Sequence, residues 1–97
     1  MQFEWDEVKN ETNFQKHRIR FEEAVRIFSH PVITRVDDRQ DYGEVREIST
    51  GLLDGLVVLV VVHTDRGGTT RLISARPAKR AERKAYYDNY QEDAGGH

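Results

Sequence analysis

Positive charge is concentrated in one stretch of this chain, residues 66–84. The stretch holds seven Lys or Arg residues and a single acid, Glu82, whereas residues 1–65 hold eight Lys or Arg against 13 Asp or Glu. Residues 85–97 hold three acids and no Lys or Arg, so the net charge of −2 conceals the contrast. A cationic segment on an acidic chain suits an anion such as a phosphate, and a solvated charged face is the alternative.

Three side chains of the last expected strand, residues 69–76, are candidates to bind such an anion. Arginine meets a phosphate with two parallel N–H donors. Strict alternation points Arg71 to one face of the strand and Ser74 and Arg76 to the other. All three therefore share a site only if a bulge intervenes or Arg76 lies beyond the strand end. We expect Arg76 to bind phosphate with Ser74 as its hydrogen-bond partner, and an exposed cross-strand ion pair is the alternative for Arg71.

Further charged residues surround this strand in the sequence. The additional cationic candidates are Arg66, Lys79, Arg80 and Arg83. Glu82 is either a general base, with its proton affinity tuned by the neighbouring cations, or an ion-pair partner. We favour the second role, in which it orients Arg76, Arg80 or Tyr86.

Two histidines are placed to take part in chemistry. His17 ends the first expected helix, where the helix dipole favours the cationic ring, and this suits a general acid or a phosphate contact. A structural cap on the helix carbonyls is the alternative. His63 ends the central strand and could face the same cleft. The four histidines show no metal-ligand spacing and the chain has no cysteine, so we expect no metal ion and no cofactor.

Two helices are expected near the start of the chain. Asp6 caps the first, which runs from Glu7 to about His17 and has Val8 and Phe14 as its main apolar residues. The apolar face of the second, over residues 21–28, consists of Phe21, Ala24, Val25 and Phe28. Pro31 ends this second helix. Its N-terminus is poorly capped, because Arg20 occupies the position where a Ser or Asp side chain would cap the helix.

Five strands complete the fold, over residues 3–5, 32–36, 44–50, 56–64 and 69–76. The strand at 56–64 is too apolar for a simple alternation, so both of its faces should be covered. Pro77 then suits the first residue of a last helix, which runs to about Tyr90. The order β-α-α-β-β-β-β-α predicts an α+β domain in which helices pack on one mainly antiparallel sheet.

Length and composition exclude several classes of protein. A chain of 97 residues suits one domain, which we place at residues 1–90, with a disordered tail at 91–97. Its longest apolar run, Leu56 to Val62, is far shorter than the roughly 18 residues of a membrane helix. The absence of cysteine excludes disulfide-stapled and zinc-finger proteins. The acidic start of the chain lacks the apolar core of a signal peptide, so we expect a cytoplasmic protein with no membrane partner.

Residues 73–87, with the sequence ISARPAKRAERKAYY, resemble the BrnT family of type II toxins. The first half of the chain agrees independently, through F-x-W-D at residues 3–6, Lys9, Asn13, Lys16-His17 and Phe21-x-x-Ala24. Thr64-x-Arg66, Arg71, Ser74-Ala75-Arg76, Ala78, Glu82-Arg83 and Tyr86 also fall in register. The Asp-Asp-Pro that is common in the family before the second strand reads Ser29-His30-Pro31 here. Two positions near the helix ends also depart from the family, because Arg18 replaces the usual Gly and Arg20 the usual Ser. These changes lose a flexible turn and a helix cap, and they add positive charge beside His17.

The resemblance implies a RelE-like fold and a ribonuclease that blocks translation when free. It implies metal-independent cleavage of mRNA, alone or on the ribosome, by attack of a ribose 2′-OH on the adjacent phosphate. The catalytic residues would be Arg76, Ser74, Glu82, His17 and Arg71, and the RNA contacts would be Arg66, Lys79, Arg80 and Arg83.

The resemblance also implies a partner. This is a BrnA-like antitoxin with a ribbon-helix-helix domain, expected in a 2:2 complex that binds its own operator DNA. Two alternatives without enzymatic activity stay open, a corepressor subunit and a degenerate toxin.

Overall fold

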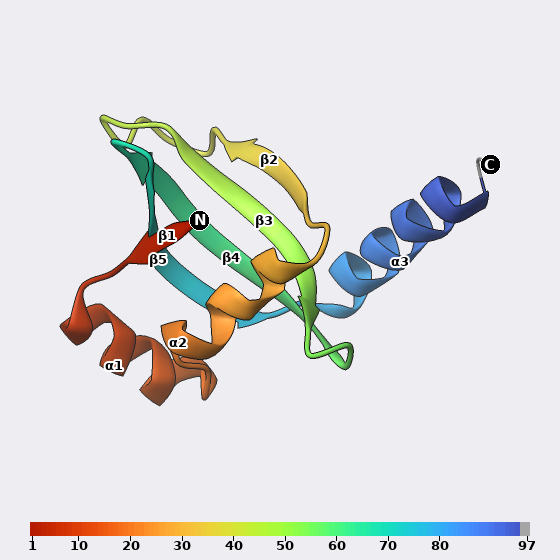
Figure 1. The fold of residues 1–97 in the computed structure, drawn as a ribbon, viewed down its shortest axis with the longest axis horizontal. Helices are drawn as coiled ribbons and strands as arrows, with labels where there is room; N and C mark the ends of the chain where they lie inside the picture. Colours follow the sequence, from red (N-terminus) through yellow and green to blue (C-terminus); the bar gives the residue numbers. More distant parts are fainter. Residues whose placement is uncertain (96–97) are drawn as a thin grey trace.

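One five-stranded sheet organises the chain (Figure 1). The structure, a computed structural model, describes the backbone of residues 1–95 and the side chains of residues 1–89. The strands are β1 (Gln2–Glu4), β2 (Ile33–Asp37), β3 (Arg46–Leu53), β4 (Val57–Arg66) and β5 (Thr69–Pro77). The helices are α1 (Glu7–His17), α2 (Phe21–Ala24), the 3₁₀ helix η1 (Val25–Ser29) and α3 (Arg80–Gly95).

The strands lie in the order β1-β5-β4-β3-β2. β1 runs parallel to β5, and each of the other pairs is antiparallel. The predicted α+β class and the mainly antiparallel sheet are confirmed. The chain order is β1-α1-α2-η1-β2-β3-β4-β5-α3, so the prediction lacked η1.

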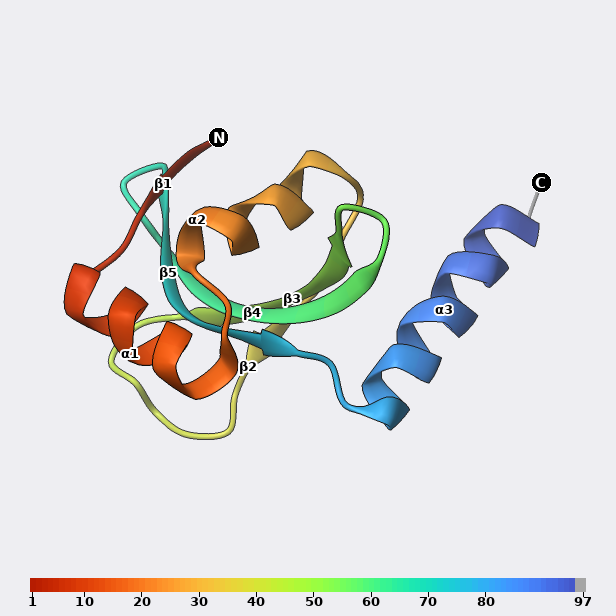
Figure 2. The ribbon, with the colours of Figure 1, turned by 90° about the horizontal axis from the view of Figure 1, so that it is seen from below.

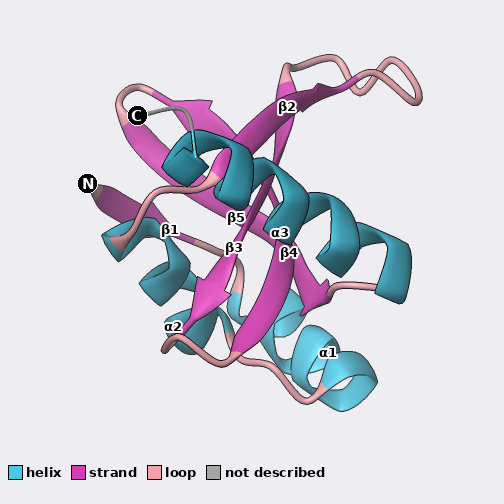
Figure 3. Cartoon of the chain, turned by 90° about the vertical axis from the view of Figure 1, so that its right-hand side faces the viewer, coloured by secondary structure: helices cyan, strands magenta, loops and turns pink. Residues whose placement is uncertain are grey.

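The two faces of the sheet are covered unequally (Figures 2 and 3). α2 and η1 cover one side, which we call the helical face, and α1 lies at its edge beside β5. The main core there consists of Ile19, Phe21, Ala24, Ile27, Leu59, Val61, Leu72 and Ala75. A smaller core on the opposite face consists of Ile48, Val58, Val60, Ala78 and Tyr86. Each large buried side chain stabilises the fold by about 1.5–3 kcal/mol relative to exposure.

β4 is the strand that both cores share. Its residues 58–61 are buried, with alternate side chains in the two cores, as the unbroken apolar run predicts. The run overestimates burial at its start, because Leu56 lies in the turn before β4 and is 81% exposed.

α1 begins as predicted but packs through unexpected residues. The Asp6 carboxylate accepts hydrogen bonds from the backbone N–H groups of Val8 and Lys9, at 2.8 and 3.2 Å. Val8, one of the two main apolar residues of this helix, is 75% exposed and does not contribute to the core. The buried residues of α1 are instead two polar ones, Asn10 and Asn13.

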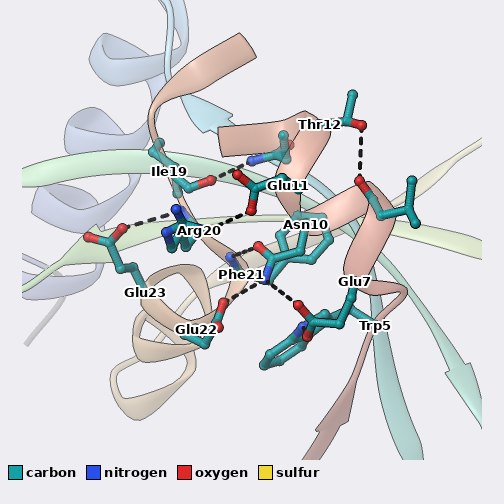
Figure 4. A network of polar contacts seen from close by, with 12 residues as sticks. Trp5, Glu7, Asn10, Glu11, Thr12, Ile19, Arg20, Phe21, Glu22 and Glu23 are labelled. Carbon is teal, nitrogen blue, oxygen red and sulfur yellow. Dashed lines mark hydrogen bonds and ion pairs between the residues drawn. The ribbon is translucent and has the colours of Figure 1, made fainter. Parts of the chain in front are cut away.

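Asn10 replaces the helix cap that the sequence lacks at Arg20 (Figure 4). Its Oδ1 accepts a hydrogen bond from the backbone N–H of Phe21, the first residue of α2, at 2.8 Å. Its Nδ2 donates to the Glu22 carboxylate at 2.7 Å. The Glu23 carboxylate accepts from the Arg20 backbone N–H at 3.2 Å. A guanidinium has no acceptor, so these contacts satisfy the helix start in its place.

Asn13 joins α1 to the sheet. Its Nδ2 donates to the carbonyl oxygens of Ala75 and Ile19, at 2.8 and 2.9 Å, and its Oδ1 accepts from the Ala75 backbone N–H at 3.0 Å. β1 pairs only with residues 69–71 of β5. The Asn13 amide therefore serves the backbone of Ala75 much as a neighbouring strand would.

The predicted second helix divides into α2 and η1, and it ends before Pro31 as expected. η1 lies close to β3 at Gly51. A Cβ atom on Gly51 would lie 2.8 Å from Val32 Cγ1 and 3.2 Å from Ile27 Cβ. Both distances are shorter than ordinary contacts, so glycine is needed where this helix meets the sheet.

The prediction that Pro77 opens the last helix is wrong. Pro77 ends β5, the Ala78 backbone N–H donates to the Val58 carbonyl at 2.8 Å, and α3 begins at Arg80. α3 then projects away from the sheet (Figures 1 and 2), with Tyr86 as its buried anchor.

The structure describes less of the C-terminal end than of the rest of the chain. No helix in the described part of the chain is both long and apolar enough to cross a membrane. α3 is assigned up to Gly95, but the side chains from Tyr90 onward and residues 96–97 lie outside the described residues. The disordered tail expected at 91–97 therefore stays a prediction.

Candidate active site

A β-bulge decides which side chains of β5 share a face. Val62 pairs with Ser74 and His63 pairs with Leu72, so Ile73 is an extra residue in β5. Because partners across a ladder point to the same side, the bulge reverses the alternation between Arg71 and Ser74. Arg71, Ser74 and Arg76 pair with Thr64, Val62 and Val60 and therefore lie on one face, opposite the helical face. Such a bulge was one of the two conditions under which the sequence analysis allowed all three side chains to share one site.

Arg46 of β3 belongs to the same side. It pairs with Asp37 of β2 and is followed by Glu47, which pairs with His63 on the helical face. We call the side that carries Arg46, Arg71, Ser74 and Arg76 the cationic face. The sheet thus separates its main apolar core from these polar side chains.

Arg76 is held by Glu82 of α3. Its Nη1 and Nη2 donate to the two carboxylate oxygens at 2.7 and 2.8 Å. These bonds, and one from the Lys79 backbone N–H, lower the pKa of Glu82 to about 2. A carboxylate with so low a pKa is a weak proton acceptor, and both of its oxygens are bound by Arg76, which argues against a general base. The predicted ion pair of Glu82 is confirmed, with Arg76 as its partner.

His17 lies at the rim of the cationic face. It lines a hollow whose other residues are Lys9, Thr12, Asn13, Lys16, Ile73 and Ser74. Burial, followed by the positive charges of Lys16 and Arg76, lowers the pKa of His17. The direction of this shift is opposite to the expectation that the helix end favours a cationic ring.

Ser74 and Arg71 are less firmly held. Ser74 lines the hollow beside His17 and lies on the same face as Arg76, as expected. Arg71 lies 3.7 Å from the Glu4 carboxylate, which corresponds to the cross-strand ion pair considered as an alternative. A partly exposed pair at this distance is weak, so Glu4 holds Arg71 only loosely.

The four expected RNA contacts fall into two places. Arg66 pairs with Glu44 at 3.3 Å near the β4–β5 turn, roughly 20 Å along the strand from Arg76. Lys79, Arg80 and Arg83 lie at the start of α3, next to Arg76 in the chain. The Arg83 side chain donates to the Ala78 carbonyl at 2.8 Å. The structure therefore brings three of the four near Arg76 and leaves Arg66 apart.

His63 does not reach the cationic face. It pairs with Leu72, which lies in the main core, and its side chain is buried on the helical face. Its Nε2 lies 2.7 Å from the Ser49 hydroxyl, and its ring packs edge-on against Phe28. Burial lowers the pKa of His63. The possibility that it shares a cleft with the arginines is therefore wrong, because the register places it on the other side.

The sequence analysis missed the segment between β2 and β3. Arg39 and Tyr42 come from this segment and both bind Asp37, whose side chain is fully buried. The positive charge of Arg39 acts on Arg76, so the segment lies near the cationic face. The only signal in the sequence was a polar turn with one Arg and one Tyr among acidic residues, and this is ordinary for a solvated loop.

Metal ligands do not gather in the part of the chain that the structure describes. No three His, Cys, Asp or Glu side chains there are grouped so that they could hold an ion. The expectation of no metal and no cofactor stays a prediction.

Comparisons with known proteins identify the family and a solved structure of similar fold. Residues 5–82 match a family model described as the ribonuclease toxin BrnT of a type II toxin-antitoxin system. The chain belongs to the BrnT family. The match contains Arg71, Ser74, Arg76 and His17 and ends at Glu82, in the first turn of α3. The resemblance read from the sequence is therefore confirmed.

A solved BrnT structure has the same fold. The crystal structure of the ribonuclease toxin BrnT of Brucella abortus aligns with a TM-score of 0.64 at 27% identity, over 82% of this chain and 99% of that one. A search among curated proteins gives no significant match.

Proposed function

We propose that this BrnT-family chain is an mRNA endoribonuclease that acts at the cationic face without a metal ion and stops translation. The observation that carries the proposal is the bulge at Ile73, which gathers Arg71, Ser74 and Arg76 on one face beside His17. RNA brings its own nucleophile, the ribose 2′-OH. The protein must then supply a base for the 2′-OH proton and cations for the charge that develops on the phosphate.

His17 is the proposed base. Its lowered pKa leaves the ring neutral near pH 7, so it can accept the 2′-OH proton. The 2′-oxygen then bonds to phosphorus as the bond from phosphorus to the 5′-oxygen breaks. The products are a 2′,3′-cyclic phosphate and a 5′-OH end whose proton comes from solvent.

Arg76 is the proposed phosphate ligand. Glu82 and the Pro77 carbonyl together use three of its five N–H donors. The Nε–H and one Nη2–H remain, and they lie along one edge of the guanidinium, where they form a second fork for a phosphate. In this proposal Glu82 orients Arg76, and Arg71 adds positive charge on the same face.

The remaining expectations of the family are part of the proposal. The chain would have a RelE-like fold, act in the cytoplasm and bind a BrnA-like antitoxin with a ribbon-helix-helix domain. An acidic segment of that antitoxin would cover residues 66–84 in a 2:2 complex that binds operator DNA. Light scattering on the co-expressed pair should give the mass of two toxins and two antitoxins, and a 1:1 mass would contradict this stoichiometry.

Analysis of RNA ends tests the activity itself. Purified protein incubated with RNA in excess EDTA should give fragments with 2′,3′-cyclic phosphate ends, and primer extension after induction should show cuts in cellular mRNA. Loss of cleavage in EDTA that Mg²⁺ restores would overturn the metal-free mechanism. Growth that continues after induction, with no cuts, would favour the non-enzymatic alternatives.

The pH dependence of the same assay tests His17. Cleavage should fall as the pH drops through the lowered pKa of His17, with a midpoint below the ordinary value of 6.5. His17→Gln should lose both the activity and this limb of the profile. A midpoint above 6.5 would contradict a neutral His17 as the base.

A further inference from the structure

We infer that Arg46, held against the ring of Tyr42, binds a phosphate of the RNA next to the one that Arg76 and Arg71 bind. The inference rests on the proposed function and adds a residue to it. Arg46 lies outside the cationic segment at 66–84, and only the structure relates it to the site.

Arg46 has unused donors in a restrained position. Its guanidinium carbon lies 3.9 Å from the centroid of the Tyr42 ring, in cation–π contact. Its Nε is buried without a hydrogen-bond partner. Within the described residues no carboxylate lies within salt-bridge distance of it. A buried donor left unpaired is unfavourable, and an acceptor on a bound ligand would relieve this.

Other arginines of the chain do not share this combination. Glu11, Asp54, Asp37, Glu44, Glu4 and Glu82 each pair with an arginine. The other arginines without a carboxylate partner are exposed, so water satisfies them: Arg18, Arg35, Arg80 and Arg83. Arg46 alone among the described arginines combines a buried N–H with no acceptor, which points to a ligand outside the chain.

A buried carboxylate fixes the position of Tyr42. Asp37 is 3% exposed and accepts hydrogen bonds from the Tyr42 hydroxyl at 3.1 Å and from Arg39 Nε and Nη2 at 2.7 and 2.8 Å. The bonds from Arg39 are the main reason that the pKa of Asp37 lies far below its usual range. An anchor that stays ionised holds Tyr42, and Tyr42 in turn orients the plane of Arg46.

The register places Arg46 within reach of the proposed site. Arg46 lies across from Thr64, whose hydroxyl donates to the neighbouring Val45 carbonyl, and Thr64 pairs with Arg71. Two strand spacings, roughly 10 Å, separate the backbones of Arg46 and Arg71 on the same face. Long arginine side chains bridge much of that span, so one RNA strand can contact both.

The salt dependence of RNA binding tests the inference. The probe is a short 2′-O-methyl RNA of mixed sequence, which cannot be cleaved because its 2′-oxygens are blocked. Binding is measured between about 50 and 200 mM salt, where the slope of log K against log salt changes by about 0.7 for each phosphate contact on a single strand. Arg46→Ala should lower this slope by about one contact and weaken binding about tenfold at low salt.

Two conservative variants and a control complete the experiment. Arg46→Lys keeps the charge but not the planar fork, so it should keep most of the slope and lose part of the affinity. Tyr42→Phe keeps the ring but loses the bond to Asp37, and it should weaken binding without changing the slope. Arg26→Ala, which removes an exposed arginine paired with Asp54, should change neither quantity.

The outcomes separate this inference from the proposed function. If the wild-type protein neither binds nor cleaves RNA, the proposed function fails. If it does both and a folded Arg46→Ala protein keeps the wild-type slope, only the assignment of Arg46 fails. If circular dichroism shows that the Arg46→Ala protein does not fold, the two conservative variants provide the test. Wild-type affinity of both Arg46→Lys and Tyr42→Phe would then overturn the assignment of Arg46.

Discussion

The helical face and the cationic face of the sheet use the same strands for different purposes. On the helical face, polar groups are buried and paired, as Asn13 with Ala75 and His63 with Ser49. On the cationic face, Arg46 and Arg76 keep unused donors, and Arg71 has only a distant partner. Polar groups that are fully satisfied stabilise a fold, whereas a cation with free donors adds little to stability and is available to a ligand. Substitutions on the two faces should therefore affect different properties.

The largest effect is expected from Arg76→Ala on the cationic face. Loss of a ligand for the developing charge should lower cleavage by about 10²–10³-fold, roughly 3–4 kcal/mol of transition-state stabilisation. Arg76→Lys should rescue little, because lysine lacks the fork. Cleavage rates and a melting curve for each variant check this. Full activity of Arg76→Ala would place the site elsewhere, and a failure to fold would make Arg76 structural and pass the assignment to Arg71 and Arg80.

On the helical face, Asn13→Ala should act on stability instead. It leaves the N–H and C=O of Ala75 and the carbonyl of Ile19 without partners, and we expect a loss of about 3 kcal/mol in the free energy of unfolding. Thr12→Ala, on the exposed side of the same helix, is the control and should cost less than about 0.5 kcal/mol. Urea titration measures both, and equal stability of the two variants would contradict this view of Asn13.

Arg18 lies between the two faces, at the end of α1, and has a φ of 61°. This left-handed conformation favours glycine, so Arg18→Gly should stabilise the fold by about 1 kcal/mol. Gln15→Gly, inside the same helix, should have the opposite sign by a similar amount. If both substitutions destabilise the protein, the contact of the Arg18 guanidinium with the Phe14 ring outweighs the backbone strain.

The smallest effect should appear only as a dependence of stability on pH. The pKa of His63 is lower in the folded than in the unfolded chain, so the unfolded chain binds more protons as the pH falls below about 6.5. Stability should therefore decrease from that pH downward until His63 also titrates in the folded chain. His63→Gln should reduce this slope, whereas His30→Gln, at an exposed position, should leave it unchanged. Parallel curves for wild type and His63→Gln would refute the argument.

Features that depend on neighbours in the sequence were predicted well. The Asp6 cap, the end of the second helix before Pro31 and the two-sided burial of β4 follow from local propensity and spacing. The predicted helix start at Pro77 was wrong, because local sequence did not decide between two structures there. A proline suits both the end of a strand and the start of a helix, and only the hydrogen bond from Ala78 to Val58 decides between them.

The sequence by itself determined the elements, the cationic segment at 66–84 and the family, because these depend on residue types and their spacing along the chain. The tertiary structure decided which side chains meet. The extra residue at Ile73 turns Arg71 to the side of Ser74 and Arg76, and Asn10 supplies a cap that Arg20 cannot. Desolvation and the charges of Lys16 and Arg76 lower the pKa of His17, and the strand register puts Arg46 on the same face, against the ring of Tyr42. Each of these depends on strand register or on contacts between distant segments, and neither follows from local spacing.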